Sequence, residues 1–350
     1  MLKIAVVGAG VIGRVHINLI QAHSGCALLA VADPTESAQK FCASQNISWF
    51  ENLETLLQQV RPDGVILATP NAMHVTQALQ CLVVGAAVLI EKPIAHTVQD
   101  AQRLIHAMAC AKDVTSAKVL IGHHRAYSPI MAKAMEVINE GRLGKLVSVM
   151  GSALFFKPDH YFQDAPWRMV SGGGPILINL IHEIHNLRKL CGEIVEVQAM
   201  SSNAIRGFEV EDTAAINFRF ASGVLGTFLV SDTSASARSW EQTSQEIKTY
   251  PSYDDEDCYV LAGTLGSLSV PTMRMKTYAT LDERSWFKPF ESNRLDLQRE
   301  DPMKLQLQHF VELIQNDIKP HVSAIDGLQN LLVVEAIQQS IQTQKTVRIK

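Results

Sequence analysis

The sequence lacks several features that would assign a class of protein directly. It has no basic run and a formal net charge of -4, so nothing favours a nucleic acid or an anionic membrane surface as partner. No apolar stretch reaches membrane-spanning length, because Lys, Glu, Gln or Asn interrupts each one. The first expected strand begins at Leu2, which leaves no room for a secretory signal, and we expect a cytoplasmic chain.

Cysteine pairs at metal or redox spacing are also missing. None of the six cysteines belongs to a C-x-x-C pair, and most lie inside apolar patterns. We interpret them as buried, reduced thiols, which agrees with a cytoplasmic location.

What is present fits a folded chain of two domains. A chain of 350 residues is too long for one ordinary hydrophobic core. Hydrophobic residues make up 47% of it and charged residues 19%, as in globular proteins. In the first third, short apolar strands alternate with helices, which predicts a parallel, doubly wound α/β sheet. The expected strands are Leu2–Val7, Ala27–Ala32, Gly64–Ala68, Ala87–Ile90 and Lys118–Ile121, with helices at Val11–Ala22, Leu53–Val60, His74–Val84 and Val98–Ala111.

The pattern changes near Gly122, where strands begin to follow one another with little helix between them. Short connections predict a mostly antiparallel, open-faced sheet in an α+β domain, and we place the domains at 1–122 and 123–350. A polar stretch, Ser231–Asp257, is expected as a loop whose acidic run is solvated. The expected strands are Leu146–Phe155, Val195–Met200, Thr213–Phe220, Val224–Val230, Cys258–Ala262 and Ser267–Val270, with helices at Tyr127–Glu140, Ile176–Leu190, Leu305–Gln315 and Leu328–Gln342.

A glycine motif follows the first strand, in the run Gly8-Ala9-Gly10-Val11-Ile12-Gly13. The pattern alone is weak, but here it ends a strand, opens a helix and lies in a β-α-β unit. Gly8 permits the tight turn, Gly10 lets a pyrophosphate approach, and Gly13 allows close packing of helix on strand. The helix start, with Val11 and Ile12, offers N–H groups to the phosphates, which predicts a dinucleotide site rather than a simple turn.

Asp33 ends the second strand, 20 residues after Gly13. Its carboxylate can accept hydrogen bonds from the adenosine ribose and repel a 2′-phosphate, and Pro34 rather than arginine follows. The sequence therefore favours NAD over NADP. The alternative is an ordinary turn residue.

Three further segments suggest a family. They are Thr69-Pro70-Asn71-Ala72-Met73-His74, Glu91-Lys92-Pro93, and Gly172-Gly173-Gly174-Pro175 leading into a helix with His182. With the N-terminal glycines, this ordered set resembles the Gfo/Idh/MocA oxidoreductases over essentially the whole chain. The resemblance implies a nicotinamide-dependent enzyme acting on a secondary alcohol, with Thr69, Pro70, Asn71, His74, Glu91 and Lys92 at the cofactor site.

Lys92 and His182 are the expected catalytic residues. Lys92 ends a parallel strand, where an ammonium can stabilise a developing alkoxide, and Glu91 beside it could hold it in place. An imidazole is the side chain whose ordinary pKa lies nearest neutrality, so His182 suits a general base for the hydroxyl proton. Asn179, three residues earlier on the expected helix, can bind a substrate hydroxyl without titrating. We expect Lys92 and His182 to act on one substrate hydroxyl.

The chain departs from the common family pattern at two positions. Many members carry aspartate four residues before and three residues after the histidine, where this chain has Ile178 and His185. Two open alternatives follow: a non-catalytic regulator that binds NAD(P), or an enzyme that retains NAD while transforming a sugar.

The remaining candidates are Arg125, Trp167 and Arg168. Arg125 could bind a carboxylate or polyol edge, and Trp167 could stack on a sugar face; the alternatives are an interdomain ion pair for Arg125 and a core aromatic for Trp167. His182-Glu183-Ile184-His185 lacks zinc spacing, so we expect no metal. The expected partners are a small polyol-like or sugar-like substrate and further copies of the chain, as a homodimer or homotetramer paired through the open sheet face.

Overall fold

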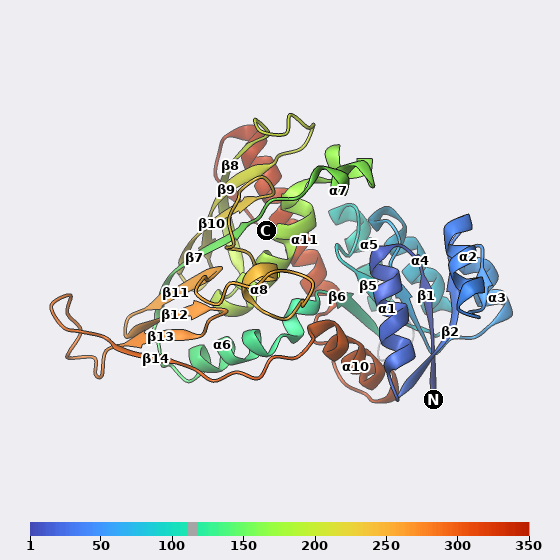
Figure 1. The fold of residues 1–350 in the computed structure, drawn as a ribbon, viewed down its shortest axis with the longest axis horizontal. Helices are drawn as coiled ribbons and strands as arrows, with labels where there is room; N and C mark the ends of the chain where they lie inside the picture. The colour runs from blue at the N-terminus through green and yellow to red at the C-terminus, as the bar shows by residue number, and fades with distance from the viewer. Residues whose placement is uncertain (111–117, 350) are drawn as a thin grey trace. The chain divides into compact units, whose positions relative to one another are not determined.

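The computed structural model describes residues 1–110 and 118–349 and divides into two compact units (Figure 1). Unit 1 comprises Met1–His124 and Met303–Leu331, and unit 2 comprises Arg125–Pro302 and the chain from Leu332 onward. No helix in the described ranges is long and apolar enough to cross a bilayer.

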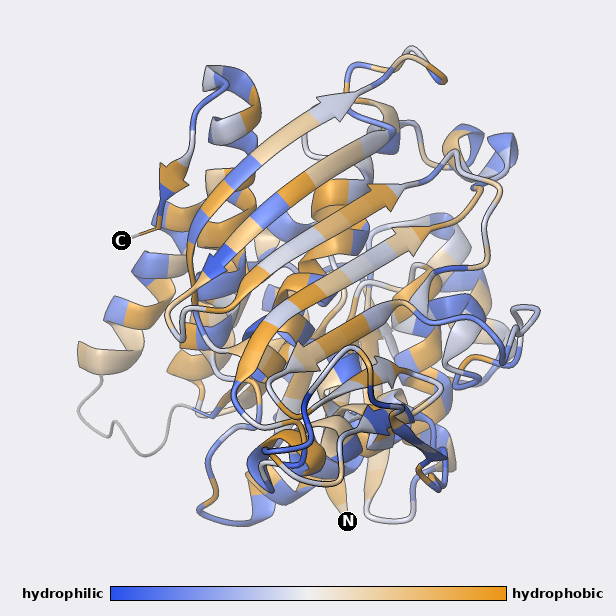
Figure 2. Ribbon diagram, turned by 90° about the vertical axis from the view of Figure 1, so that its left-hand side faces the viewer, coloured by the Kyte–Doolittle hydropathy of each residue, from blue (hydrophilic) through white to orange (hydrophobic). Residues whose placement is uncertain are grey.

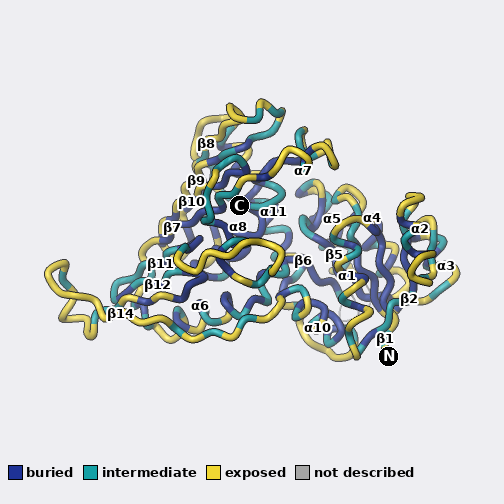
Figure 3. The backbone as a smooth tube through the Cα atoms, viewed as in Figure 1, coloured by how far each residue is buried: buried dark blue, intermediate teal, exposed yellow. Residues whose placement is uncertain are grey.

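Unit 1 is built on a six-stranded sheet in the order β3-β2-β1-β4-β5-β6, with all neighbours parallel. Strands β4, β5 and β6 are buried along their whole length, as expected for a sheet covered on both faces (Figure 3). The predicted parallel sheet is confirmed. Its strands are β1 (Leu2–Val7), β2 (Cys26–Ala32), β3 (Trp49–Phe50), β4 (Gly64–Leu67), β5 (Ala87–Glu91) and β6 (Val119–Gly122), and its helices are α1 (Val11–Ala22), α2 (Glu36–Ser44), α3 (Leu53–Gln59), α4 (Asn71–Val83), α5 (Val98–Cys110) and α10 (Pro302–Gln315).

Two elements of unit 1 were not predicted. Helix α2 is polar overall but has an N-cap, because the Thr35 side chain accepts a hydrogen bond from Ala38 N. Strand β3 is only two residues long. Helix α4 begins at Asn71 rather than at the expected His74, directly after Pro70, and the expected last residue of α5, Ala111, lies outside the described residues.

Residues 303–331 fall in unit 1, although sequence order had grouped them with the second domain. The physical reason is close packing of α10 on small residues. A Cβ added at Gly64 would lie 2.7 Å from Ile314 Cδ1 and 3.1 Å from the Phe310 ring. Lys118 Nζ also donates to the carbonyl oxygens of Ile314 and Asn316, at 3.0 Å each.

Unit 2 is built on a nine-stranded sheet in the order β14-β13-β12-β11-β7-β10-β9-β8-β15 (Figure 2). The pairs are antiparallel except β7 with β10, which run parallel. The expected mostly antiparallel sheet is therefore confirmed. Its strands are β7 (Leu146–Leu154), β8 (Ile194–Ser202), β9 (Thr213–Phe220), β10 (Leu225–Ser231), β11 (Tyr259–Gly263), β12 (Gly266–Val270), β13 (Arg274–Thr277), β14 (Glu291–Arg294) and β15 (Val347–Arg348).

One face of this sheet is buried and the other is open. Strand β9 alternates buried and exposed residues along its length, and β10 begins the same way. The buried side chains form one core with residues of α6, α8 and α11. The helical elements of unit 2 are η1 (His124–Tyr127), α6 (Pro129–Asn139), α7 (Asp159–Gln163), η2 (Pro166–Met169), η3 (Ile176–Leu180), α8 (Ile181–Cys191), α9 (Trp240–Thr243) and α11 (Ala324–Thr343), of which η1 and α11 each begin in unit 1.

Several local expectations for unit 2 need correction. The helix expected over 176–190 opens with a π turn, η3, before continuing as α8. The stretch expected as a loop contains α9. Its acidic run is not wholly solvated, because Asp257 is buried, accepts hydrogen bonds from Thr272 and pairs with Arg274. Five of the cysteines are buried and unpaired as expected, whereas Cys110 is exposed.

Candidate functional site

The glycine turn after β1 has the geometry of a phosphate-binding loop. Gly8 has a φ of +93°, and a Cβ there would lie 2.5 Å from the Ala68 carbonyl oxygen. A Cβ on Gly13 would lie 1.9 Å from the Gly8 carbonyl oxygen, so only glycine allows this packing. A Cβ on Gly10 would meet nothing within 4 Å. Gly8 and Gly13 thus fix the shape of the loop, and Gly10 leaves room for a ligand to approach the loop backbone.

The first turn of α1 is arranged to receive an anion. Its N-cap, Gly10, makes no side-chain capping hydrogen bond, and no acidic residue occupies the first turn. Val11 is 84% exposed, so the start of the helix is accessible. The N–H groups and positive dipole end of such a helix fit the pyrophosphate of a dinucleotide.

Asp33 is held against this loop. Its Oδ2 accepts a hydrogen bond from Ala9 N at 2.8 Å, and its Oδ1 accepts from the backbone N and hydroxyl of Thr35 at 2.9 and 2.6 Å. The side chain therefore forms a local turn as well as standing at the carboxyl end of β2, next to the glycines. The interpretation of Asp33 as a ribose ligand is therefore compatible with its interpretation as a turn residue.

His74 joins the ends of two strands. Its ring nitrogens lie 2.8 Å from the carbonyl oxygens of Thr69 and Pro93, and the Thr69 hydroxyl donates to Gln77 Oε1 at 2.6 Å. Burial lowers the pKa of His74, against the opposing effect of these carbonyls. The neutral ring is thus favoured, with one N–H to share between them. Pro70 and Asn71 lie at the N-terminus of α4.

Glu91 anchors the segment that carries Lys92. Its buried carboxylate accepts a hydrogen bond from His16 Nε2 at 2.7 Å and another from Lys92 N at 3.2 Å. Burial alone would raise the pKa of Glu91, but the His16 hydrogen bond and the charges of His16, His124 and Lys92 outweigh it, so the pKa is lowered. A charged carboxylate therefore fixes the backbone at Lys92, which is half-buried.

In unit 2, Asn179 lies in the π turn and His182 in the first turn of α8. His182 is buried, and Asn179 is half-buried. The helix expected to carry both residues is therefore a π turn followed by an α-helix, with Asn179 in the first and His182 in the second. Asn179 Oδ1 accepts a hydrogen bond from Lys157 Nζ at 2.7 Å, a contact that sequence reasoning missed. Two residues depart from the family pattern. Ile178 lies in the π turn, and His185 is buried in α8.

Arg125 belongs to a buried ionic cluster. Its guanidinium pairs with Glu183 and, at 2.5 Å, with Glu241, and Glu183 also accepts a hydrogen bond from the Tyr259 hydroxyl. Burial raises the pKa of Glu183 to about 7, opposed by the charge of Arg125. These ion pairs lie within unit 2, unlike the interdomain ion pair named as the alternative, and they favour a role for Arg125 in positioning α8.

Trp167 and Arg168 lie on the short helix η2. Trp167 is 54% exposed, so it is not a core aromatic. The Arg168 guanidinium carbon stacks 3.7 Å from the centre of the Tyr161 ring, and its Nη1 donates to the Tyr161 carbonyl oxygen at 2.5 Å.

Four functional candidates were missed because their partners are distant in sequence. His16 occupies a buried position of α1, where an apolar residue would be expected. Lys157 directly follows Phe155 and Phe156, just past the end of β7, and Glu183 and Asp232 are isolated acids. Only a polar residue inside an apolar pattern hinted at their burial.

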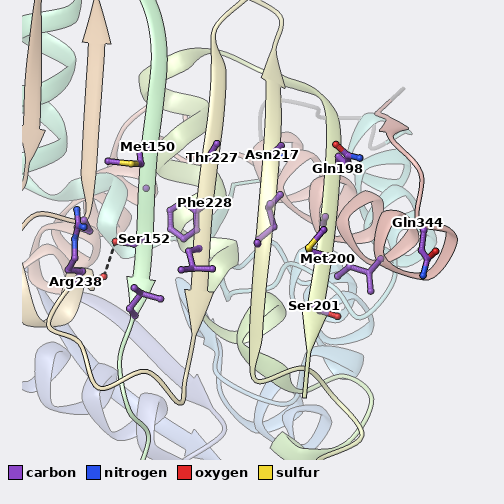
Figure 4. Close-up of a pocket in the computed structure, with 18 residues that line it drawn as sticks. Met150, Ser152, Gln198, Met200, Ser201, Asn217, Thr227, Phe228, Arg238 and Gln344 are labelled. Carbon is purple, nitrogen blue, oxygen red and sulfur yellow. Dashed lines mark hydrogen bonds between the residues drawn. The ribbon is translucent and has the colours of Figure 1, made fainter. Parts of the chain in front are cut away.

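No group of three or more His, Cys, Asp or Glu among the described residues could hold a metal ion. A hollow of about 760 Å³ lies instead on the open face of the unit 2 sheet, lined by residues of β7 to β10 such as Met150, Thr227 and Gln198 (Figure 4). It contains none of the predicted catalytic residues, and we assign it to the sheet surface.

The parallel sheet, glycine loop and acid at the end of β2 define a dinucleotide-binding oxidoreductase. Comparison with known families agrees: residues 2–118 match the oxidoreductase family with an NAD-binding Rossmann fold, and residues 131–269 match the GFO/IDH/MocA C-terminal domain. The chain belongs to the Gfo/Idh/MocA family. This confirms the resemblance and the prediction of an NAD(P)-dependent dehydrogenase.

Individual relatives are distant. The chain is 27% identical over 359 residues to a scyllo-inositol 2-dehydrogenase (NAD(+)) of Bacillus subtilis, covering 99% of this chain and 96% of that one. It is 28% identical over 194 residues to the rhizopine catabolism protein MocA of Rhizobium meliloti, covering 55% of this chain and 57% of that protein. A crystal structure of the WlbA dehydrogenase from Bordetella pertussis, with NADH and UDP-GlcNAcA, has the same fold, with a TM-score of 0.79, 21% identity, and coverage of 100% and 99%.

Proposed function

We propose that this protein oxidises, or in reverse forms, a secondary alcohol on a sugar, polyol, cyclitol or related hydroxy compound, with NAD as the hydride carrier. The observation that carries the proposal is the open glycine loop with Asp33 tethered to Ala9 N at 2.8 Å. The inositol dehydrogenases among the relatives support the substrate class.

The preference for NAD follows from Asp33. A carboxylate beside the glycine turn can accept hydrogen bonds from the two ribose hydroxyls, whereas a 2′-phosphate would meet a like charge. Gly8, Gly10, Val11, Ile12 and Gly13 would hold the pyrophosphate, and Thr69, Pro70, Asn71, His74, Glu91 and Lys92 would complete the cofactor site. When bound, the nicotinamide ring supplies the hydride acceptor.

Side chains of the protein are proposed to accept the substrate proton and to stabilise the negative charge on its oxygen. We assign His182 as the base that accepts the hydroxyl proton, and Lys92 as the cation that offsets negative charge on the substrate oxygen. Glu91 and His16 fix the backbone at Lys92. Asn179 binds a substrate oxygen, and Trp167 and Arg168 are proposed to contact the rest of the substrate.

A polyol, sugar and sugar-acid panel with NAD, followed by NADH absorbance, tests this function. Lys92→Ala and His182→Ala should each lose roughly two to four orders of magnitude in kcat, the scale of oxyanion and general-base contributions. NAD affinity, measured separately by fluorescence titration, should change little. Lys40→Ala and His106→Ala, at exposed positions of unit 1, are the matched controls. Full activity in either test variant would refute its assignment.

Gel filtration of the purified protein separates two modes of action. An ordinary dehydrogenase releases NAD on the column, whereas an enzyme that transforms sugars through transient oxidation carries it through. A wild type that binds NAD but oxidises nothing in the panel would overturn the dehydrogenase proposal in favour of a regulator.

We also propose that copies of the chain pair as a homodimer or homotetramer through the open sheet face. Met150, Met200 and Leu229 on this face are 53%, 73% and 40% exposed. An apolar sheet face of this kind is covered when a second copy packs on it by a two-fold axis.

A further inference from the structure

Lys157 is held rigidly in unit 2 from several sides. Its backbone N donates to the Asp232 carbonyl oxygen at 2.9 Å, and its own carbonyl oxygen accepts from Arg206 Nη2 at 2.7 Å. The side chain is buried, and its Nζ lies 4.9 Å from the centre of the Tyr161 ring and 3.6 Å from Asp232 Oδ2. Such a lysine offers a donor at a fixed point, because little rotamer freedom is left to it.

This fixed donor decides which way the Asn179 amide faces. An ammonium has three donors and no acceptor, so only the oxygen of an amide can face it. The 2.7 Å contact from Lys157 Nζ to Asn179 Oδ1 therefore turns the NH₂ group to the opposite side. Among the described residues, no hydrogen bond from Asn179 Nδ2 to a protein acceptor is formed.

We propose that Lys157 is a positioning residue that fixes Asn179 with its Nδ2 toward the substrate, so that this site recognises a hydrogen-bond acceptor. The inference rests on the proposed function, since it assigns part of the same substrate site. The group recognised is an oxygen lone pair beside the reacting carbon, on a hydroxyl, carbonyl or carboxylate. A carboxylate at this point would instead accept a hydrogen bond from a substrate hydroxyl.

Asn179→Asp tests the direction of the hydrogen bond. The new carboxylate keeps its contact with Lys157 but presents an acceptor where the NH₂ group was. Because the contact is to a non-reacting oxygen, it forms in the bound substrate and in the transition state alike, and its loss should raise KM more than it lowers kcat. We expect KM to rise about tenfold to a hundredfold, the scale of one hydrogen bond with its partner left unsatisfied. An unchanged KM would overturn the proposal.

A double-mutant cycle tests whether Lys157 acts through Asn179. Lys157→Met removes the donor and puts an apolar side chain of similar length in its place. Asp232 retains its ion pair with Arg206 at 2.9 Å, so the variant leaves no unpaired buried charge there. We expect Lys157→Met to raise KM about tenfold alone, and by less than about twofold in an Asn179→Ala background. Additive effects on KM would mean a merely structural lysine and would overturn the proposal.

Two further variants complete the design. Lys157→Arg keeps a donor and should restore KM to within a few-fold of wild type, while Lys133→Met, on the surface helix α6, should leave KM unchanged. Thermal unfolding of each variant verifies the fold, and Asn179→Asp carries the test if Lys157→Met does not fold. A wild type without turnover overturns the proposed function itself, whereas an active wild type with an additive cycle overturns only this inference.

Discussion

At the scale of single residues, the Asp33 carboxylate combines two tasks. Its carboxylate accepts a hydrogen bond from Ala9 N and stands where the ribose of a dinucleotide is expected. We predict that Asp33→Ala, and more strongly Asp33→Ala with Pro34→Arg, lowers the ratio of kcat/KM for NAD to that for NADP by about tenfold to a hundredfold, the scale of charged hydrogen bonds.

Asp63 provides a matched control for this prediction. Its carboxylate also accepts a backbone hydrogen bond, from Lys3 N at 2.7 Å, but it lies before β4 rather than after β2. Asp63→Ala should leave the ratio unchanged. A wild type that already prefers NADP would contradict the role given to Asp33.

Glu183 carries a prediction about pH and stability. Its pKa is raised from 4.5 to about 7, mainly by burial, so the folded protein keeps a proton that the unfolded chain releases near pH 4.5. The folded state then binds more protons, and the stability that Glu183 contributes is lost as pH rises through this window. Arg125, Glu241, Tyr259 and Cys258 are the titratable groups around it.

Urea unfolding of wild type and Glu183→Gln at several pH values measures this effect. The variant should gain stability relative to wild type between about pH 5 and 7, by at most about 1.4 kcal/mol per pH unit. Glu136→Gln, at an exposed ion pair, should show no such trend. A constant difference between Glu183→Gln and wild type across the range would show that Glu183 is charged throughout.

At the scale of elements, the glycine loop separates folding from binding. A Cβ on Gly13 would lie 1.9 Å from the Gly8 carbonyl oxygen, whereas a Cβ on Gly10 meets nothing within 4 Å. We predict that Gly13→Ala loses about 1–3 kcal/mol of stability or more, through overpacking. Gly10→Ala should keep its melting temperature and lose NAD affinity, because the methyl group occupies the approach of the pyrophosphate. Calorimetry and NAD titration measure the two effects, and wild-type NAD affinity in Gly10→Ala would contradict this account.

Elements with a strong apolar period were predictable, and those defined by local capping or distant packing were not. The sequence predicts β1 and α1 with the bounds they have, because each carries a clear pattern next to the glycines. Helix α2 has only a short apolar face, Ala38, Phe41 and Cys42, within nine mostly polar residues, and it begins at the Thr35 cap. The π turn at Ile176–Leu180 leaves the residue pattern unchanged, so periodicity could not reveal it.

The same distinction applies to the candidate site. Gly8, Gly10, Gly13 and Asp33 were predictable because their spacing is local and follows one strand-to-helix unit. The partner of Asn179, Lys157, is 22 residues away, and the partner of Arg125, Glu183, is 58 residues away. Nothing in the local pattern specifies such pairs, since they depend on how the strands and helices of unit 2 pack.

At the scale of the whole molecule, the open sheet of unit 2 is the surface through which we propose that copies of the chain pair. Along β9 and β10 the buried residues alternate with exposed ones, so one face of the sheet is buried in the core. The other presents Met150 and Leu229, 53% and 40% exposed, around the hollow of about 760 Å³. Apolar side chains exposed in this way are costly in water, and we propose that a symmetric copy of the chain covers them.

We therefore predict that the wild type is a dimer or tetramer by light scattering at micromolar concentration. Met150→Glu with Leu229→Glu should shift it to smaller species, because pairing two such faces would bring four carboxylates into an apolar contact. The melting temperature of each unit's core should be little affected, since both side chains lie outside it. Val83→Glu, at an apolar position that is 87% exposed on α4, is the matched control and should keep the wild-type assembly. A monomeric wild type, or a double variant that assembles as before, would show that the sheet face is not where copies meet.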